Sequence, residues 1–83
     1  MRYLTYFTEG RNRIDINNSW LGEESVFYNG ELVSRQTSLL GSLHEFKVTE
    51  DNVDTWYRVN ISLRWPFRIG FDIFRNGKAL LLS

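Results

Sequence analysis

One turn signal occurs twice in this chain, each time between two runs of mostly apolar residues. The first copy lies in VFYNGELV, residues 26–33, and the second in IFRNGKAL, residues 73–80. Asn and Gly both tolerate positive φ, and an Asn-Gly loop of two residues forms a type I′ turn whose twist matches that of paired strands. The repeated signal therefore predicts two antiparallel β-hairpins, and it directs the whole chain towards an all-β fold.

Apolar and polar residues alternate along most of the remaining sequence. In YRVNISL, residues 57–63, every second residue is apolar. This alternation is typical of strands with one buried face and one wet face, and no segment has the spacing of an amphipathic helix. Turn-forming clusters separate the runs. We predict about eight strands, near residues 2–8, 13–18, 23–28, 31–36, 43–49, 55–64, 67–75 and 78–82.

A chain of 83 residues has room for one hydrophobic core. We therefore expect a single domain over residues 1–83, built as a small antiparallel β-sandwich, with a small β-barrel as the alternative. TSLLGS, residues 37–42, interrupts the strand pattern. We interpret it as a bulge, a plug over one end of the core or a crossover between sheets.

The two-residue loops also predict which residues face each other across each hairpin. We prefer them to a longer loop with a bulge, although they place Arg75 opposite Lys78. The register places Phe74 beside Ala79 and Leu81 beside Asp72 on one face of the sheet, where they form an exposed apolar patch. The other expected facing pairs are Phe27 with Leu32, Val26 with Val33, Glu24 with Arg35, Phe71 with Leu82 and Ile73 with Leu80.

Charge and composition narrow the function classes. Ten basic and ten acidic side chains give a net charge of zero, which argues against binding to nucleic acid. The absence of cysteine excludes disulfides, thiolate metal ligands and a thiol nucleophile. The longest apolar run is ALLL, residues 79–82, far below the roughly 20 residues that span a bilayer. With no signal-peptide pattern at the N-terminus, we expect a soluble cytoplasmic protein that does not bind membranes.

Catalytic and metal-binding patterns are weak in this sequence. His44 is the only histidine, so neither a histidine metal cluster nor a relay of two imidazoles can form, and we interpret His44 as structural. The neighbouring carboxylates Glu23 and Glu24 point to opposite faces of a strand. We therefore expect no enzymatic activity, no cofactor and no metal.

The three tryptophans are the most informative residues for binding. Trp56 falls on the polar side of its strand together with Arg58, so the two can stack, while Trp20 and Trp65 lie near turns. Exposed tryptophans form stacking platforms for sugars or hot spots for protein partners, although in small domains they also close the ends of thin cores. The candidate binding residues are Trp20, Trp56, Arg58, Trp65, Phe74 and Leu81.

A family resemblance supports the protein-binding interpretation. The run WLGEESVFYNGELVSRQTSLLGSLHEF, residues 20–46, and the run FDIFRNGKAL, residues 71–80, resemble the β-modules of the Fas apoptotic inhibitory molecule family. That family has two compact all-β modules, whereas this chain has the length of one. The resemblance implies a non-catalytic β-sandwich that works through protein contacts, and it carries over no enzymatic site.

We therefore expect a non-enzymatic protein-interaction module, with a carbohydrate-binding module that uses the exposed tryptophans as the alternative. The partner is another protein or a second copy of this chain. ALLLS, residues 79–83, offers apolar side chains on both faces of a terminal edge strand, and such strands are templates for β-pairing. This feature predicts a homodimer.

Overall fold

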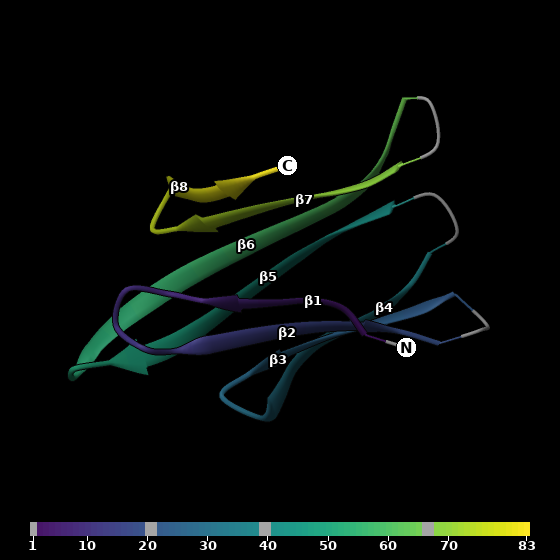
Figure 1. The fold of residues 1–83 in the computed structure, drawn as a ribbon. Coiled ribbons are helices and arrows are strands. Elements are labelled where there is room, and N and C mark those ends of the chain that lie inside the picture. The colour runs from purple at the N-terminus through teal and green to yellow at the C-terminus, as the bar shows by residue number, and fades with distance from the viewer. Residues whose placement is uncertain (1, 20–21, 39–40, 66–67) are drawn as a thin grey trace. The chain divides into compact units, whose positions relative to one another are not determined.

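The computed structural model describes residues 2–19, 22–38, 41–65 and 68–83 and confirms the all-β fold (Figure 1). All the predicted strands are present, and their observed bounds differ from the prediction by at most two residues. The strands are β1 (Arg2–Phe7), β2 (Arg13–Asn18), β3 (Glu23–Tyr28), β4 (Glu31–Thr37), β5 (Gly41–Glu50), β6 (Val53–Arg64), β7 (Arg68–Arg75) and β8 (Lys78–Leu82).

The strands pair into two four-stranded antiparallel sheets, in the orders β1-β2-β3-β4 and β5-β6-β7-β8. In each sheet every strand pairs with the next one along the chain, so both are simple meanders. Within the described residues the pairing closes neither sheet on itself, and the barrel alternative is therefore wrong. The chain divides into two compact units, residues 1–39 and residues 40–83, with one sheet in each. TSLLGS spans this division, and Leu39 and Leu40 lie outside the described residues.

The turns confirm the conformation expected of Asn-Gly. Asn29 and Gly30 have φ of 50° and 87°, and Asn76 and Gly77 have φ of 49° and 81°. Positive φ at both central residues defines the type I′ turn. The loop Asp51-Asn52, between β5 and β6, has the same signature, with φ of 52° and 66°. Three of the hairpins therefore close with turns of one kind, although only two carry glycine.

Beyond each Asn-Gly turn the strands lose the predicted register by one residue. Phe27 faces Leu32 as expected, but Val26 then faces Ser34, so Val33 is an extra residue in β4. In the second hairpin Phe74 faces Ala79 and Ile73 faces Leu81, so the extra residue in β8 is Leu80. These are β-bulges, in which two residues of one strand oppose one residue of its partner.

The bulges make four of the predicted facing pairs wrong: Val26 with Val33, Glu24 with Arg35, Phe71 with Leu82, and Ile73 with Leu80. Arg35 faces Ser25 instead, and its Nε lies 3.7 Å from Glu23 Oε1. Leu82 faces Asp72. A bulge moves every residue beyond it to the other side of the sheet, because side chains alternate with a period of two.

The two units repeat one structural plan. In the first unit the backbone N–H of Asn29 donates to the carbonyl of Arg13 at 2.8 Å, and the N–H of Arg13 donates to Asn29 Oδ1 at 2.7 Å. Asn76 and Trp56 exchange the same two bonds in the second unit, at 2.7 and 2.9 Å. We call this reciprocal pair of bonds the turn brace. It ties the tip of the last hairpin to the second strand of the same sheet.

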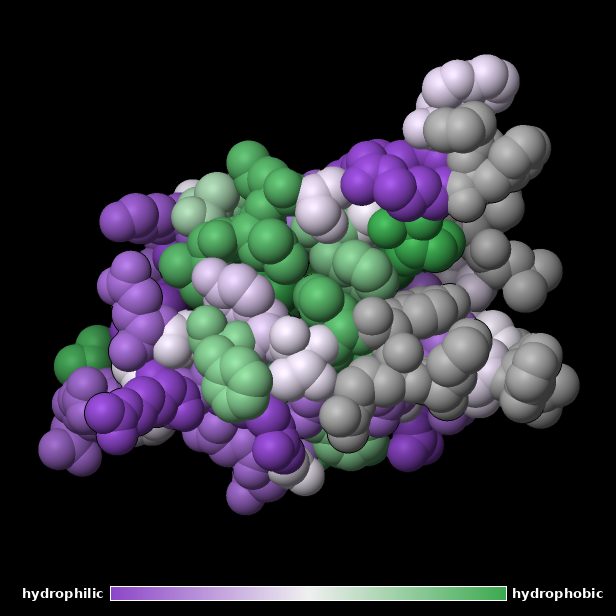
Figure 2. All heavy atoms as spheres, in the orientation of Figure 1, coloured by the Kyte–Doolittle hydropathy of each residue, from purple (hydrophilic) through white to green (hydrophobic). Residues whose placement is uncertain are grey.

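The repeat extends to the buried residues. Ile16 faces Val26 in the first sheet, Val59 faces Ile73 at the equivalent place in the second, and all four side chains are fully buried. In the second unit His44 is also buried and its Nε2 lies 2.9 Å from Ser42 Oγ, an environment that fits the structural role we expect. Apolar atoms gather over β7 and β8, and hydrophilic atoms gather around the β5–β6 turn (Figure 2).

Candidate binding face

The second sheet has one face that carries the exposed aromatic residues. Along β6 the side chains of Tyr57, Val59 and Ile61 are buried, whereas Trp56 and Arg58, which alternate with them, are exposed. Alternate residues of a strand point to opposite sides of the sheet. We call the side with Trp56 and Arg58 the Trp56 face.

Cross-strand pairing brings further residues to this face. Arg58 faces Glu45 of β5 and Phe74 of β7, and Phe74 faces Ala79 of β8. These four residues form one row across the sheet. The next row, on the side away from Trp56, consists of Leu43, Asn60, Asp72 and Leu82.

The Trp56 face carries accessible apolar side chains among polar ones. Trp56 is 57% exposed and Leu82 is 65% exposed, Leu43 and Ala79 are also exposed, and Phe74 is half-buried. Three of the predicted binding residues, Trp56, Arg58 and Phe74, therefore lie together in adjacent rows of one sheet.

Each cation near Trp56 has an acidic partner. Lys47 Nζ lies 5.7 Å from the centroid of the Trp56 ring and 3.7 Å from Asp54 Oδ2, while Arg58 Nε lies 3.6 Å from Glu45 Oε2. The cation over the indole is therefore Lys47, in place of the predicted Arg58. Exposed pairs of this kind stabilise a fold by only about 0–1 kcal/mol. Their main effect is to leave the face without net charge.

The other predicted binding residues do not join this face. Trp65 follows the end of β6 and is 90% exposed. Nine residues of extended strand put Trp65 roughly 30 Å from Trp56, so the two indoles do not form one platform. Leu81 faces Ile73 on the opposite side of the sheet, which corrects its predicted place beside Asp72 on the side of Phe74. Trp20 lies outside the described residues.

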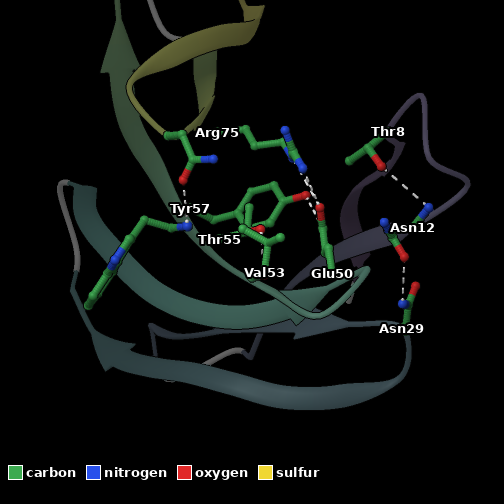
Figure 3. A network of polar contacts seen from close by, with 10 residues as sticks. Thr8, Asn12, Asn29, Glu50, Val53, Thr55, Tyr57 and Arg75 are labelled. Carbon is green, nitrogen blue, oxygen red and sulfur yellow. Dashed lines mark hydrogen bonds and ion pairs between the residues drawn. The ribbon is translucent and has the colours of Figure 1, made fainter.

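A polar cluster of Glu50, Tyr57 and Arg75 lies at one end of the second sheet (Figure 3). Strand pairing and the alternation along β6 place it on the side opposite to Trp56. Tyr57 donates its hydroxyl hydrogen to Glu50 Oε2 at 2.5 Å. Arg75 donates to Glu50 Oε1 from Nη2 at 2.7 Å and from Nε at 3.0 Å. The Tyr57 ring stacks on Phe46, with the centroids 5.3 Å apart. The carboxylate thus holds together the ends of β5 and β7 and the start of β6.

The pKa shifts in this cluster indicate a structural role. Burial, followed by the hydrogen bond to Glu50, raises the pKa of Tyr57 to about 12. The hydrogen bond to Glu50 also raises the pKa of Arg75 above its ordinary value. A phenol with so high a pKa stays protonated near neutral pH and is a poor general base or nucleophile there. The cluster also explains why Arg75 is tolerated opposite Lys78, since Arg75 is bound to a carboxylate.

Sequence reasoning missed this cluster for a physical reason. Glu50, Tyr57 and Arg75 come from three strands, and they meet only once the register of both hairpins is set. The sequence contained one indirect indication of the cluster. Arg75 lies opposite Lys78, and because two like charges facing each other are unfavourable, an acidic group is expected nearby.

A similar arrangement holds a buried carboxylate in the first unit. Asp15 of β2 is buried, accepts a hydrogen bond from Thr5 Oγ1 at 2.7 Å and pairs with Arg13 Nε at 2.8 Å. It takes the place in the first sheet that Arg58 has in the second. Because both carboxylate oxygens already have partners, we interpret Asp15 as structural.

Comparisons of this chain with models of protein families, with curated proteins and with solved structures find no match. The resemblance to the Fas apoptotic inhibitory molecule family therefore stays a prediction. Within the described ranges no three side chains of His, Cys, Asp or Glu come together in a way that could hold a metal ion. The same part of the chain contains no helix long and apolar enough to cross a membrane.

Proposed function

We propose that this chain is a non-enzymatic protein-interaction module that contacts its partner through the Trp56 face. The observation that carries the proposal is the grouping of Trp56, Arg58 and Phe74 in adjacent rows of one sheet. Tryptophan and arginine are among the residues most enriched at interface hot spots, and the tryptophan ring buries a large area for few rotatable bonds.

Electrostatics suggest what kind of surface would fit. The ion pairs of Lys47 with Asp54 and of Arg58 with Glu45 neutralise the face, so steering by net charge is weak. A partner with an apolar centre and a mixed polar rim would match it. A second copy of this chain presents such a surface, which supports the homodimer as one form of the proposal. The absence of cysteine fits work in a reducing compartment such as the cytoplasm.

The carbohydrate-binding alternative has weaker support. Sugar platforms on β-sheets use aromatic rings that lie together, whereas Trp56 lies near the start of β6 and Trp65 follows its end. On the Trp56 face the indole of Trp56 is exposed, but its ring already has Lys47 over it. Protein contact therefore accounts better for the grouped residues.

The experiment compares two tryptophan substitutions. Trp56→Ser should leave the fold intact, since the turn brace holds Trp56 through its backbone, while Trp65→Ser removes a more exposed tryptophan outside the face. Sedimentation at micromolar concentration measures self-association. Quantitative capture from a cell extract, with each variant immobilised, measures other partners.

We expect Trp56→Ser to abolish either the dimer or the specific capture, and Trp65→Ser to retain it. Equal binding by both variants and the parent would contradict the proposal. Binding to immobilised glycans that needs Trp56 or Trp65 would support the carbohydrate alternative in its place.

A further inference from the structure

The two Asn-Gly turns place the same reactive pair in two different environments. Asn29 has its carboxamide held at both ends: Oδ1 accepts the N–H of Arg13 at 2.7 Å, and Nδ2 donates to Asn12 Oδ1 at 3.0 Å. Asn76 has its carboxamide held at one end only, where Oδ1 accepts the N–H of Trp56 at 2.9 Å. Within the described residues its Nδ2 has no hydrogen-bond partner.

The glycines that follow these asparagines also differ in their surroundings. Gly30 precedes Glu31, and Gly77 precedes Lys78. A Cβ at Gly77 would meet no atom within 4 Å, whereas one at Gly30 would meet Arg13 Nη2 at 3.9 Å. The positive charge of Lys78 next to Gly77 favours loss of the proton from the backbone nitrogen of Gly77. At Gly30 the negative charge of Glu31 opposes this loss, since the nearby Arg13 guanidinium is already paired with Asp15.

We propose that Asn76 is a site of spontaneous deamidation and that Asn29 is protected from the same reaction. The deprotonated backbone nitrogen of Gly77 attacks Asn76 Cγ, a C–N bond forms, and the bond from Cγ to Nδ2 breaks with release of ammonia. Water then opens the five-membered imide at either carbonyl carbon. The products are an aspartate or an isoaspartate at position 76.

Hydrogen bonding decides the difference between the two sites. Attack requires the carboxamide to rotate until Cγ lies in line with the glycine nitrogen. Asn29 must first break two side-chain hydrogen bonds to rotate, and Asn76 must break one. Glycine provides no side chain to obstruct the approach in either turn, so the number of anchors and the adjacent charge set the relative rates.

Deamidation of Asn76 would alter the Trp56 face. The effect on binding rests on the proposed function, whereas the deamidation reaction itself is independent of that function. An isoaspartate at position 76 adds one carbon atom to the main chain of a two-residue turn. Such a turn no longer positions both bonds of the brace to Trp56. Deamidation would therefore loosen the start of β6, where the indole of Trp56 is held.

The test follows both sites in the purified chain during incubation at 37 °C and mildly alkaline pH. Peptide mapping by mass spectrometry separates asparagine, aspartate and isoaspartate at positions 29 and 76. We expect Asn76 to convert several-fold faster than Asn29 in the folded chain, and the difference to shrink in urea, where the side-chain hydrogen bonds are lost.

Two variants test the two causes separately. Asn12→Ala removes the acceptor of Asn29 Nδ2 and should speed conversion of Asn29 alone, while Lys78→Glu should slow conversion of Asn76 alone. Conversion of Asn29 as fast as that of Asn76 in the folded parent would overturn the proposal. A rate difference that is undiminished in urea would overturn its structural basis.

Discussion

At the scale of single residues, Tyr57 is a polar side chain with a structural role. Its ring packs on Phe46, and its hydroxyl reaches Glu50, which Arg75 also binds. Removal of any one partner leaves the other polar groups of this half-buried cluster unsatisfied. The cluster therefore couples three strand ends through three side chains.

The raised pKa of Tyr57 predicts a loss of stability at alkaline pH. The folded chain holds the phenol proton up to a pKa of about 12, whereas an unfolded tyrosine releases it near pH 10. The stabilisation is thus fully present below about pH 10 and disappears as the pH rises towards 12. We expect a contribution of about 1–2 kcal/mol.

Urea unfolding of the parent and of Tyr57→Phe, measured at steps from pH 8 to pH 12, checks this prediction. The variant should be less stable than the parent at pH 8, and the two should converge towards pH 12. The comparison cancels the titration of the other tyrosines. A difference in stability that does not change with pH would show that the phenol proton is not held by folding.

At the scale of elements, the hairpins show that local sequence determines the turn conformation but not the strand register beyond the turn. Asn-Gly specifies the turn conformation through the φ angles that these two residues tolerate, so the turns at residues 29–30 and 76–77 could be predicted. The bulges at Val33 and Leu80 could not, because a bulged strand has no distinctive side chain at the extra position. The placement of Leu81 was wrong for this reason, whereas Phe74, which precedes the bulge, was placed correctly beside Ala79.

The type I′ turn predicts the effect of substitution at Gly77. A Cβ there meets no neighbouring atom, so the only penalty of Gly77→Val is the positive φ of 81°. We expect a destabilisation of about 1–3 kcal/mol, since a β-branched residue strongly disfavours this region. Thermal melts or urea unfolding would measure it.

Gly77→Asn is the matched control, because Asn52 already occupies the same turn position with φ of 66°. It should unfold close to the parent. If Gly77→Val also unfolds with the parent, the turn must change type at little energetic penalty, and the assignment of a rigid type I′ turn would be wrong.

On the scale of the whole molecule, the chain consists of two four-stranded meanders with a shared plan and different surfaces. Phe27 and Phe74 occupy equivalent positions, each two residues before its turn asparagine, but Phe27 faces the buried Asp15 and Phe74 faces the exposed Arg58. Arg13 stands where the second unit has Trp56. The candidate binding face therefore belongs to the second unit alone, even though both units follow one scaffold.

The sequence predicted the scaffold better than the site. Alternation and turn residues set strand bounds locally, and these agree with the structure. The grouping of Trp56 with Arg58 also followed from alternation within one strand. The partner of the Trp56 ring, Lys47, comes from a neighbouring strand, and its position depends on the register of the Asp51-Asn52 hairpin, which the turn signals did not fix.

The turn brace has a consequence for how the sheets open. Arg13 and Trp56 are exposed residues, yet each amide hydrogen is held by an asparagine side chain in the turn that follows the next strand of the chain. Exchange of these hydrogens with solvent deuterium requires the hairpin tip to separate from the strand beside it. Such linked openings define cooperative units of the native state.

We expect the amides of Arg13 and Trp56 to exchange as slowly as those of the buried residues beside them. Asn76→Ala should accelerate exchange at Trp56 by about tenfold, the equivalent of one hydrogen bond, while Arg13 stays slow. Fast exchange at Trp56 in the parent would contradict this. Fast exchange would mean that the last hairpin of each sheet opens gradually from the sheet edge. With the brace intact, the hairpin tip separates from the second strand in one cooperative step.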